Sequence, residues 1–68
     1  MKCNVDIKKL QIARLNMGLS QSDLAQRAGV SFLAINRLEN AKTQRPHPQT
    51  IKRLCDSLNL NVTDVYLF

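Results

Sequence analysis

Apolar residues recur at helical spacing in five short segments of this chain, which are separated by glycine, proline and polar residues. The clearest stripe consists of Ile51, Leu54, Cys55 and Leu58, at the i, i+3, i+4, i+7 spacing of an amphipathic helix. We therefore expect a compact all-α fold of five helices without strands. The predicted helices cover residues 6–17, 21–28, 32–39 and 48–58, and a short segment after Asn61.

Residues that favour helix ends stand at these boundaries. Ser20 is a candidate N-cap of the second helix, and Asp23 three positions later completes a capping-box pattern. Pro48 suits the first position of the fourth helix, where its missing backbone N–H does no harm. The other boundary residues are Gly18, which closes the first helix, and the candidate N-caps Ser31 and Asn61. The boundary residues thus predict the same five helices as the apolar pattern.

The segment from residue 21 to residue 38 has the pattern of two helices that cross at a tight turn. Leu24, Ala25 and Ala28 fall on one side of the first helix, and Gly29 follows at the turn. The small side chain of Ala25 lets the second helix approach closely. The inward side of that second helix consists of Val30, Ile35 and Leu38. This pattern is typical of a helix-turn-helix, whose second helix enters the major groove of DNA.

The chain is basic: ten Lys and Arg against five Asp and Glu give a net charge of +5 and a pI near 9.8. The six basic residues between positions 24 and 53 are Arg27, Arg37, Lys42, Arg45, Lys52 and Arg53, against the single acid Glu39. Such a stretch suits a polyanion, because contacts with phosphates release condensed counterions. A solvated basic surface is the alternative interpretation of the charge alone.

Length and composition indicate one small domain, residues 1–68, in a cytoplasmic protein. Cys3 and Cys55 are too far apart for a metal site or a disulfide framework, and Cys55 fits a small buried apolar residue. No nucleophile elbow, phosphate-binding glycine loop or HExxH motif is present, so we expect no catalysis, cofactor, metal or small-molecule ligand. No apolar run approaches the roughly 18 residues that a membrane span needs.

Motifs along residues 7–67 resemble the Cro/CI-type, lambda-repressor-like (XRE) helix-turn-helix family of bacterial and phage regulators. The motifs are Arg14 before MGLSQ, then SQSDLAQRAGVS, INRLENAKTQRP and LCDSLNLNVTDVYL. LEN followed by a KT-x-RP loop is especially similar to small phage repressor DNA-binding domains. The resemblance implies a compact five-helix domain with its helix-turn-helix at about residues 21–39. It also implies a transcriptional repressor that binds a near-palindromic double-stranded DNA operator as a homodimer.

Base contacts are expected on the second helix of the motif, at Ser31, Phe32, Leu33, Asn36 and Arg37. Arg37 could pair with guanine or with phosphate, and Asn36 could read adenine unless its side chain turns toward the backbone. Phe32 and Leu33 depart from the family, which usually has polar residues there. Their best role on DNA is contact with thymine methyl groups. The rival explanation is packing against a neighbouring helix or a partner protein.

Other site residues follow from the resemblance. It implies phosphate contacts for Gln21, Asn40, Lys42, Thr43, Arg45 and Arg14. It also implies that Arg14 and Glu39 form the family's internal ion pair. Ala41 replaces the usual glycine of the loop. His47 stands where a related repressor type sends an arginine into the minor groove, although an exposed loop histidine is the other interpretation.

The apolar C-terminal segment is the expected dimer surface, with Tyr66, Leu67 and Phe68 as its candidate residues. Val62 and Val65 of the same segment fit core packing better. The alternative to a DNA-binding regulator is an antitoxin or other protein-interaction module of the same fold, which exposed Phe32 and Leu33 would suit. RNA binding has less support, because the chain lacks the aromatic stacking platform of RNA-binding modules.

Overall fold

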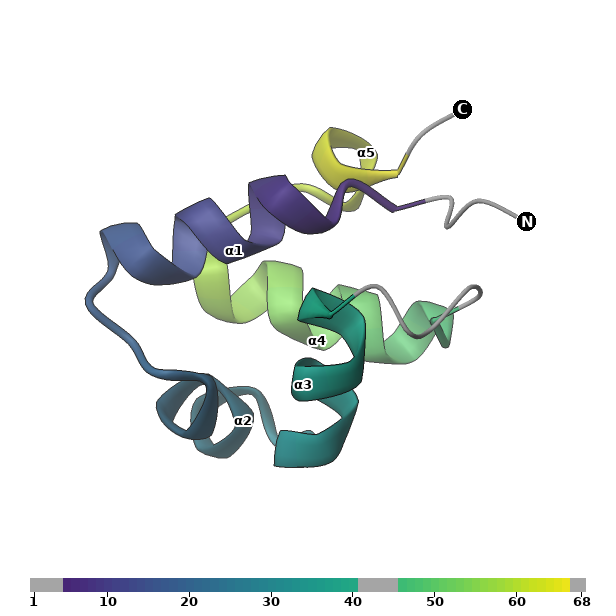
Figure 1. Ribbon diagram of the computed structural model, residues 1–68. Helices are drawn as coiled ribbons and strands as arrows, with labels where there is room; N and C mark the ends of the chain where they lie inside the picture. Colours follow the sequence, from purple (N-terminus) through teal and green to yellow (C-terminus); the bar gives the residue numbers. More distant parts are fainter. Residues whose placement is uncertain (1–4, 41–45, 67–68) are drawn as a thin grey trace.

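Five helices and no strand make up the part of the chain that the computed structural model describes, residues 5–40 and 46–66 (Figure 1). They are α1 (Ile7–Asn16), α2 (Gln21–Ala28), α3 (Phe32–Glu39), α4 (Pro48–Leu58) and α5 (Val62–Val65). The predicted all-α, five-helix fold is confirmed, and the helix ends agree closely with those expected from the caps.

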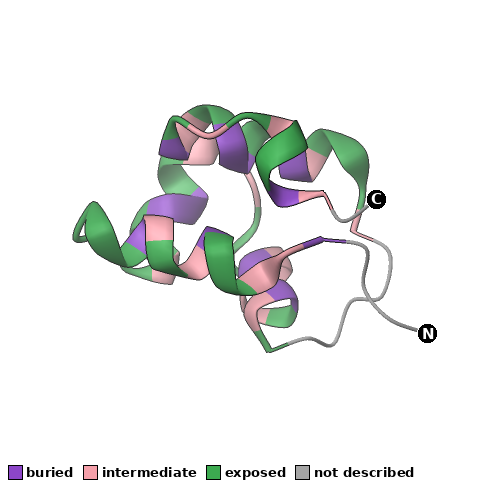
Figure 2. Ribbon diagram, turned by 90° about the horizontal axis from the view of Figure 1, so that it is seen from above, coloured by how far each residue is buried: buried purple, intermediate pink, exposed green. Residues whose placement is uncertain are grey.

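α4 carries the centre of the hydrophobic core. Its predicted stripe is buried, and Ile51 and Cys55 are 0% exposed. α1, α2 and α5 all pack against α4. Figure 2 shows the buried positions of the helices turned toward one another, with exposed positions on the outside. Burial raises the pKa of the Cys55 thiol, so this side chain stays neutral and behaves as a small apolar residue.

α2 and α3 form the helix-turn-helix. The predicted capping box is present at the start of α2, where the Ser20 hydroxyl accepts from the Asp23 backbone N–H at 3.0 Å. The Asp23 carboxylate accepts from the Ser20 N–H at 3.1 Å in return. Gly29 follows α2 in the left-handed conformation, with φ 71°, which permits the sharp turn. Ser31 then caps α3, because its hydroxyl accepts from the Ala34 N–H at 3.1 Å.

α1 is apolar on two sides. Leu10 is buried in the core, whereas Ile12 and Leu15 are 50% and 58% exposed. The N-terminus of this helix is capped by Asp6, whose carboxylate accepts from the Lys9 N–H at 3.1 Å. Because the apolar residues are not confined to one side, the cap and the tertiary contacts hold this helix more than its amphipathic pattern does.

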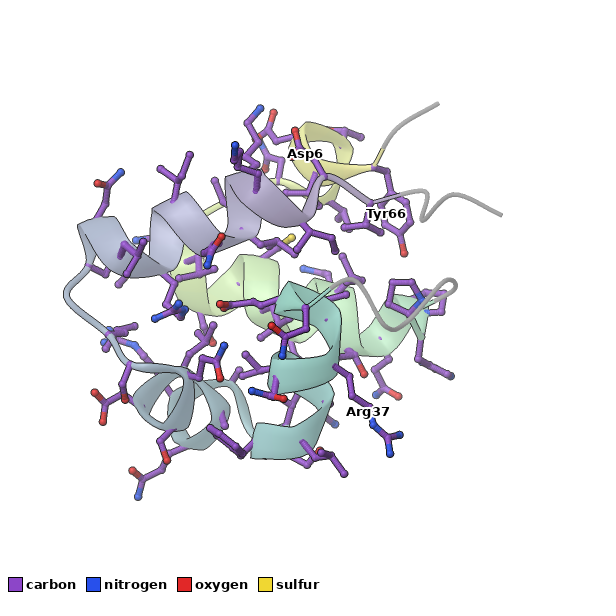
Figure 3. All side chains as sticks on the ribbon, in the orientation of Figure 1. Asp6, Arg37 and Tyr66 are labelled. Atoms are coloured by element: carbon purple, nitrogen blue, oxygen red, sulfur yellow. The ribbon has the colours of Figure 1, made fainter. Side chains whose placement is uncertain are left out.

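The two ends of the described chain lie side by side. Val5 and Tyr66 form an isolated antiparallel bridge, and the Asp6 N–H donates to the Val65 carbonyl at 2.6 Å. Figure 3 shows Asp6 and Tyr66 on the side of the molecule where α5 meets the start of α1. Val65 is fully buried there and Tyr66 is half-buried. α5 is thereby fixed against the beginning of α1.

α4 begins with a cap that the sequence analysis missed. His47 precedes the helix, and its Nδ1 accepts from the Gln49 backbone N–H at 3.1 Å. His47 is exposed, and Pro48 occupies the first helical position as predicted.

Among the helices of the described ranges, none has the length and apolar character to span a membrane.

Replacing Gly29 tests the turn between α2 and α3. An added Cβ would meet only the Arg53 Nη1, at an ordinary 3.8 Å, so any cost would come from the backbone. We expect Gly29→Ala to lower the free energy of unfolding by about 1–2 kcal/mol, because L residues disfavour positive φ. Gly29→Asn is the matched control and should lose less, since asparagine tolerates this conformation. Chemical denaturation measures both variants, and equal losses would contradict the explanation.

Candidate nucleic-acid interface

α3 has one buried side and one exposed side. Ile35 and Leu38 hold the buried side in the core, at 1% and 3% exposure. The predicted base contacts are distributed over the rest of the helix and its cap: Ser31, Phe32, Leu33 and Arg37 are exposed, and Asn36 is half-buried. The structure therefore brings these five residues together along one helix, with most of them open to an external partner.

Arg37 extends from the second turn of α3 away from the other helices (Figure 3). It forms no hydrogen bond or ion pair with any other residue that the structure describes. A guanidinium group has several N–H donors in a planar fork and keeps its charge at all relevant pH values. Arg37 is therefore available to a carboxylate, a phosphate or the edge of a guanine.

A buried ion pair joins α1 to the last residue of α3. Arg14 is only 7% exposed, and its Nε and Nη2 donate to the two carboxylate oxygens of Glu39 at 2.7 and 2.8 Å. The Arg14 Nη1 donates to the Leu19 carbonyl at 2.7 Å. The structure thus brings together the two residues of the expected ion pair. Because all three guanidinium nitrogens donate inside the protein, this geometry favours the internal role of Arg14 over its predicted phosphate contact.

Gln21 extends the ion pair into a hydrogen-bonded network. Its Nε2 donates to the Glu39 Oε1 at 3.0 Å, and its Oε1 accepts from the Asn36 Nδ2 at 3.1 Å. The Asn36 Oδ1 in turn accepts from the Asn40 Nδ2 at 3.2 Å. Both ends of the Asn36 amide are therefore occupied within the protein. This favours a role for Asn36 in positioning α3 over the adenine contact considered from the sequence.

The network keeps Glu39 ionised. Burial raises the pKa of Glu39, but hydrogen bonds from Arg14 and Gln21 and the charge of Arg14 together lower it below its ordinary value. The stability that comes from this lowered pKa is present above the ordinary glutamate pKa. It is lost as the pH falls through the lowered value, where the folded protein takes up the proton. At neutral pH the ion pair is intact.

All five acidic side chains have an internal role. Asp6, Asp23 and Asp64 accept backbone N–H groups at helix starts, Glu39 pairs with Arg14, and Asp56 pairs with Lys52. Within the described ranges, the helix-turn-helix therefore exposes Arg27 and Arg37 without an acidic partner. The exposed positive charge of the motif suits an anion.

The described ranges contain no group of His, Cys, Asp and Glu residues that could hold a metal ion.

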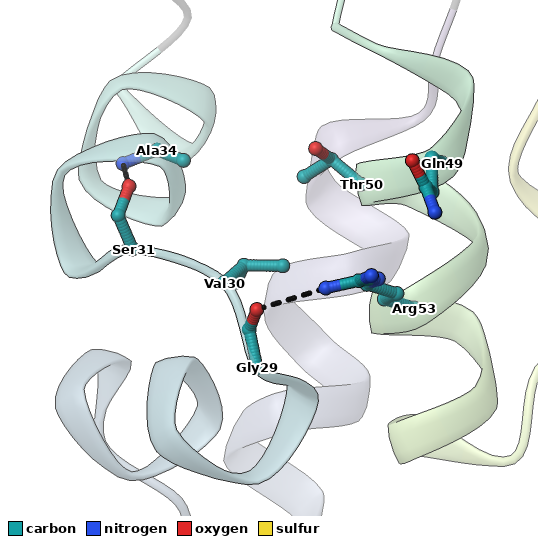
Figure 4. Close-up of a pocket in the computed structure, with 7 residues that line it drawn as sticks. All are labelled: Gly29, Val30, Ser31, Ala34, Gln49, Thr50 and Arg53. Atoms are coloured by element: carbon teal, nitrogen blue, oxygen red, sulfur yellow. Dashed lines mark hydrogen bonds between the residues drawn. The ribbon is translucent and has the colours of Figure 1, made fainter.

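A contact between α4 and the turn holds the start of α3. The Arg53 Nη1 donates to the Gly29 carbonyl at 3.1 Å (Figure 4). Residues 29–31 and Ala34, with Gln49, Thr50 and Arg53 of α4, line a small open pocket around this bond. The sequence analysis missed this contact, because 24 residues separate Gly29 from Arg53 and no local pattern links them.

The other predicted contacts lie at the margins of the described chain or outside it. Asn40 is the exposed C-cap of α3, and Gln21 is the half-buried first residue of α2. Outside the described residues lie Ala41, the predicted phosphate contacts Lys42, Thr43 and Arg45, and the predicted dimer residues Leu67 and Phe68. Their roles stay predictions.

A sequence model of the helix-turn-helix family matches residues 10–65, which include all of α2, α3 and α4. The chain belongs to this helix-turn-helix family. The predicted XRE-type identity is confirmed. This chain is also 38% identical over 53 residues to the HTH-type transcriptional repressor RghR of Bacillus subtilis (strain 168). That match covers 78% of this chain and 39% of RghR, so the chain spans about two fifths of its relative's length.

Two solved structures share the fold of this helix-turn-helix chain. One is the N-terminal DNA-binding domain of SinR from Bacillus subtilis, with a TM-score of 0.81 and 24% identity, covering 84% of this chain and 83% of that chain. The other is a crystal structure of SinR, the master regulator for biofilm formation, in complex with DNA. Its TM-score is 0.79 at 24% identity, and the match covers 84% of this chain and 90% of that chain.

Neutralising one partner of the buried ion pair should destabilise this helix-turn-helix domain. We expect Glu39→Gln to lower the free energy of unfolding by about 3 kcal/mol, because the Arg14 charge would stay buried without its counterion. Asp56→Asn is the matched control: it removes the Lys52–Asp56 pair, whose side chains are 59% and 58% exposed, and should cost less than about 1 kcal/mol. Urea denaturation at neutral pH measures both. A Glu39→Gln protein with unchanged stability would overturn the assignment.

Proposed function

We propose that this chain is a sequence-specific, double-stranded-DNA-binding transcriptional repressor. The observation that carries the proposal is the exposed side of α3, where Arg37 has no partner among the described residues and the opposite side is fixed in the core. Membership of the helix-turn-helix family supports it, as do the repressor name of RghR and the DNA complex of SinR. In this reading α3 enters the major groove and blocks transcription by occupying an operator.

The proposed contact residues fall into three groups: residues that contact bases, residues that contact phosphates, and a residue that positions another side chain. Ser31, Phe32, Leu33 and Arg37 would reach base edges from the exposed side of α3. Gln21 stands at the first position of α2, where unpaired backbone N–H groups and the helix dipole favour a phosphate. Asn36 would position Gln21 through the hydrogen bond at 3.1 Å rather than read a base. Additional phosphate contacts are proposed for Asn40, Lys42, Thr43 and Arg45.

A homodimer on a near-palindromic site would complete this function. Two copies of α3 would lie about 34 Å apart, one turn of duplex, so that each reads one half-site. Tyr66, Leu67 and Phe68 are proposed as the dimer surface. Such a protein would work in the cytoplasm and would require no catalytic chemistry, since its effect comes from occupying DNA.

One observation favours a second candidate function. Phe32 and Leu33 are 49% and 54% exposed on the proposed DNA side, and an apolar pair of this kind also suits a protein partner. The chain would then be an antitoxin or another protein-interaction module with the same fold. Arg37, on the same side of α3, suits an acidic protein as well as a nucleic acid, so binding to duplex DNA is the measurement that distinguishes the two candidates.

Binding to unrelated nucleic acids tests the proposed function. We expect measurable affinity for random duplex DNA at low salt, falling linearly on a log–log plot as salt rises, because phosphate contacts release counterions. Single-stranded RNA should bind more weakly. Selection from a random duplex pool should then yield a site with two related halves one turn apart. Negligible affinity for duplex DNA at low salt would favour the protein-interaction module.

Arg37→Ala should separate base reading from phosphate contact. If Arg37 pairs with a guanine, the variant should lose about 1–3 kcal/mol of binding to the selected duplex and much less to random duplex. Lys8→Ala is the control, since it removes an exposed cation from α1 and should affect neither measurement strongly. Fluorescence anisotropy at one fixed salt concentration gives both affinities. Equal losses on the two duplexes would assign Arg37 to phosphate.

A further inference from the structure

Two large apolar side chains at the start of α3 lie outside the hydrophobic core. Phe32 and Leu33 are the first two residues of the helix, and they are 49% and 54% exposed. Neither belongs to the hydrophobic core or to the partly buried residues packed against it. α3 is already held by Ile35 and Leu38 on its other side. Packing against a neighbouring helix, one of the explanations open from the sequence, leaves about half of each side chain uncovered.

The position of the pair also separates it from the other exposed apolar residues. Ile12 and Leu15 lie on α1 and Met17 is its C-cap, while Phe32 and Leu33 lie at the start of α3 next to the turn. Figure 1 shows α1 and the beginning of α3 at opposite sides of the molecule. Within the described ranges the apolar pair of α3 is therefore separate from the exposed apolar residues of α1, and Arg37 of the helix-turn-helix lies beside it.

The charges around Phe32 and Leu33 indicate what covers them. Arg37 lies four residues after Leu33 and thus on the same side of α3. The acid of this helix, Glu39, is neutralised by Arg14. An exposed apolar pair, beside a cation that is unpaired within the described ranges, matches a partner that has apolar groups next to negative charge. The major groove of duplex DNA is such a partner, because phosphates line its edges and the C5-methyl of thymine is the apolar group on its floor.

We infer that Phe32 and Leu33 recognise the C5-methyl groups of pyrimidines in the major groove, an inference that rests on the proposed DNA-binding function. The ligand class is a 5-methylpyrimidine. Thymine belongs to it, and so does 5-methylcytosine, which carries the same methyl on the same ring carbon. Uracil and unmodified cytosine lack that methyl. Arg37 supplies the polar part of the recognition and the apolar pair supplies the methyl-specific part.

Replacing thymine by deoxyuridine tests the inference, because the exchange removes one methyl and keeps the charge and the hydrogen-bonding edges. Each thymine of a selected duplex is exchanged in turn, and the Kd of the full chain is measured by anisotropy at fixed salt. At one or two positions in each half-site we expect a weakening of about fourfold per methyl, the value of one buried carbon group. Cytosine at the same positions should bind more tightly when it carries the 5-methyl.

Variants of the protein locate the effect. In the double variant Phe32→Ala/Leu33→Ala, a duplex with thymine and a duplex with uracil at an affected position should have equal Kd values. Ile12→Ala and Leu15→Ala are matched controls that remove exposed apolar side chains from α1, and they should keep the fourfold difference. Circular dichroism confirms that every variant is folded before binding is compared.

The possible failures are distinguishable. If a duplex is selected and bound with sequence preference, but no uracil exchange changes its Kd, the methyl inference is wrong and the proposed function stands. If the double variant Phe32→Ala/Leu33→Ala keeps the difference in Kd between the thymine and uracil duplexes, other residues contact the methyl and the inference is also wrong. If no duplex is bound at all, the proposed function fails, and the methyl inference fails with it.

Discussion

The ion pair between Arg14 and Glu39 determines how α3 is presented. It connects the last turn of α1 to the final residue of α3, and both side chains are almost fully buried. Burial of two charges is costly, so the pair adds little net stability compared with an apolar contact of the same size. Its contribution is directional, because two parallel hydrogen bonds between a guanidinium and a carboxylate permit few orientations. The position of α3 follows from that geometry.

An eight-residue helix would not be stable on its own, and each end of α3 has a separate anchor. At the C-terminal end, Gln21 bonds to both Glu39 and Asn36 and so ties α2 to the ion pair. At the N-terminal end, Ser31 caps the helix, and Arg53 holds the carbonyl of Gly29 just before it. Between these ends Ile35 lies in the core. The exposed side of α3 is therefore presented by a rigid support, which base recognition requires.

The sequence predicted the helices, their caps and the turn better than it predicted the side-chain contacts between the helices. The α4 stripe, the capping box at Ser20 and the glycine turn all leave local patterns, because each depends on residues three or four positions apart. The bond from Arg53 to Gly29 and the amide chain through Asn36 leave none. Spacing places a side chain on a face of a helix but does not choose its rotamer or its partner across the fold. α1 gave a weaker pattern for a related reason: Ile12 and Leu15 are apolar without being buried.

The distribution of charge and apolar surface separates affinity from specificity in the proposed complex. The acids are engaged in caps and ion pairs, so the net charge of +5 attracts phosphates on any duplex, and added salt weakens that attraction. Contact between Phe32 or Leu33 and a methyl group involves no counterion release, and salt affects it little. Sequence preference that comes from the apolar pair would therefore persist as salt lowers the overall affinity. Neutral hydrogen bonds to base edges would share this insensitivity to salt, whereas contacts of Arg or Lys with phosphates would not.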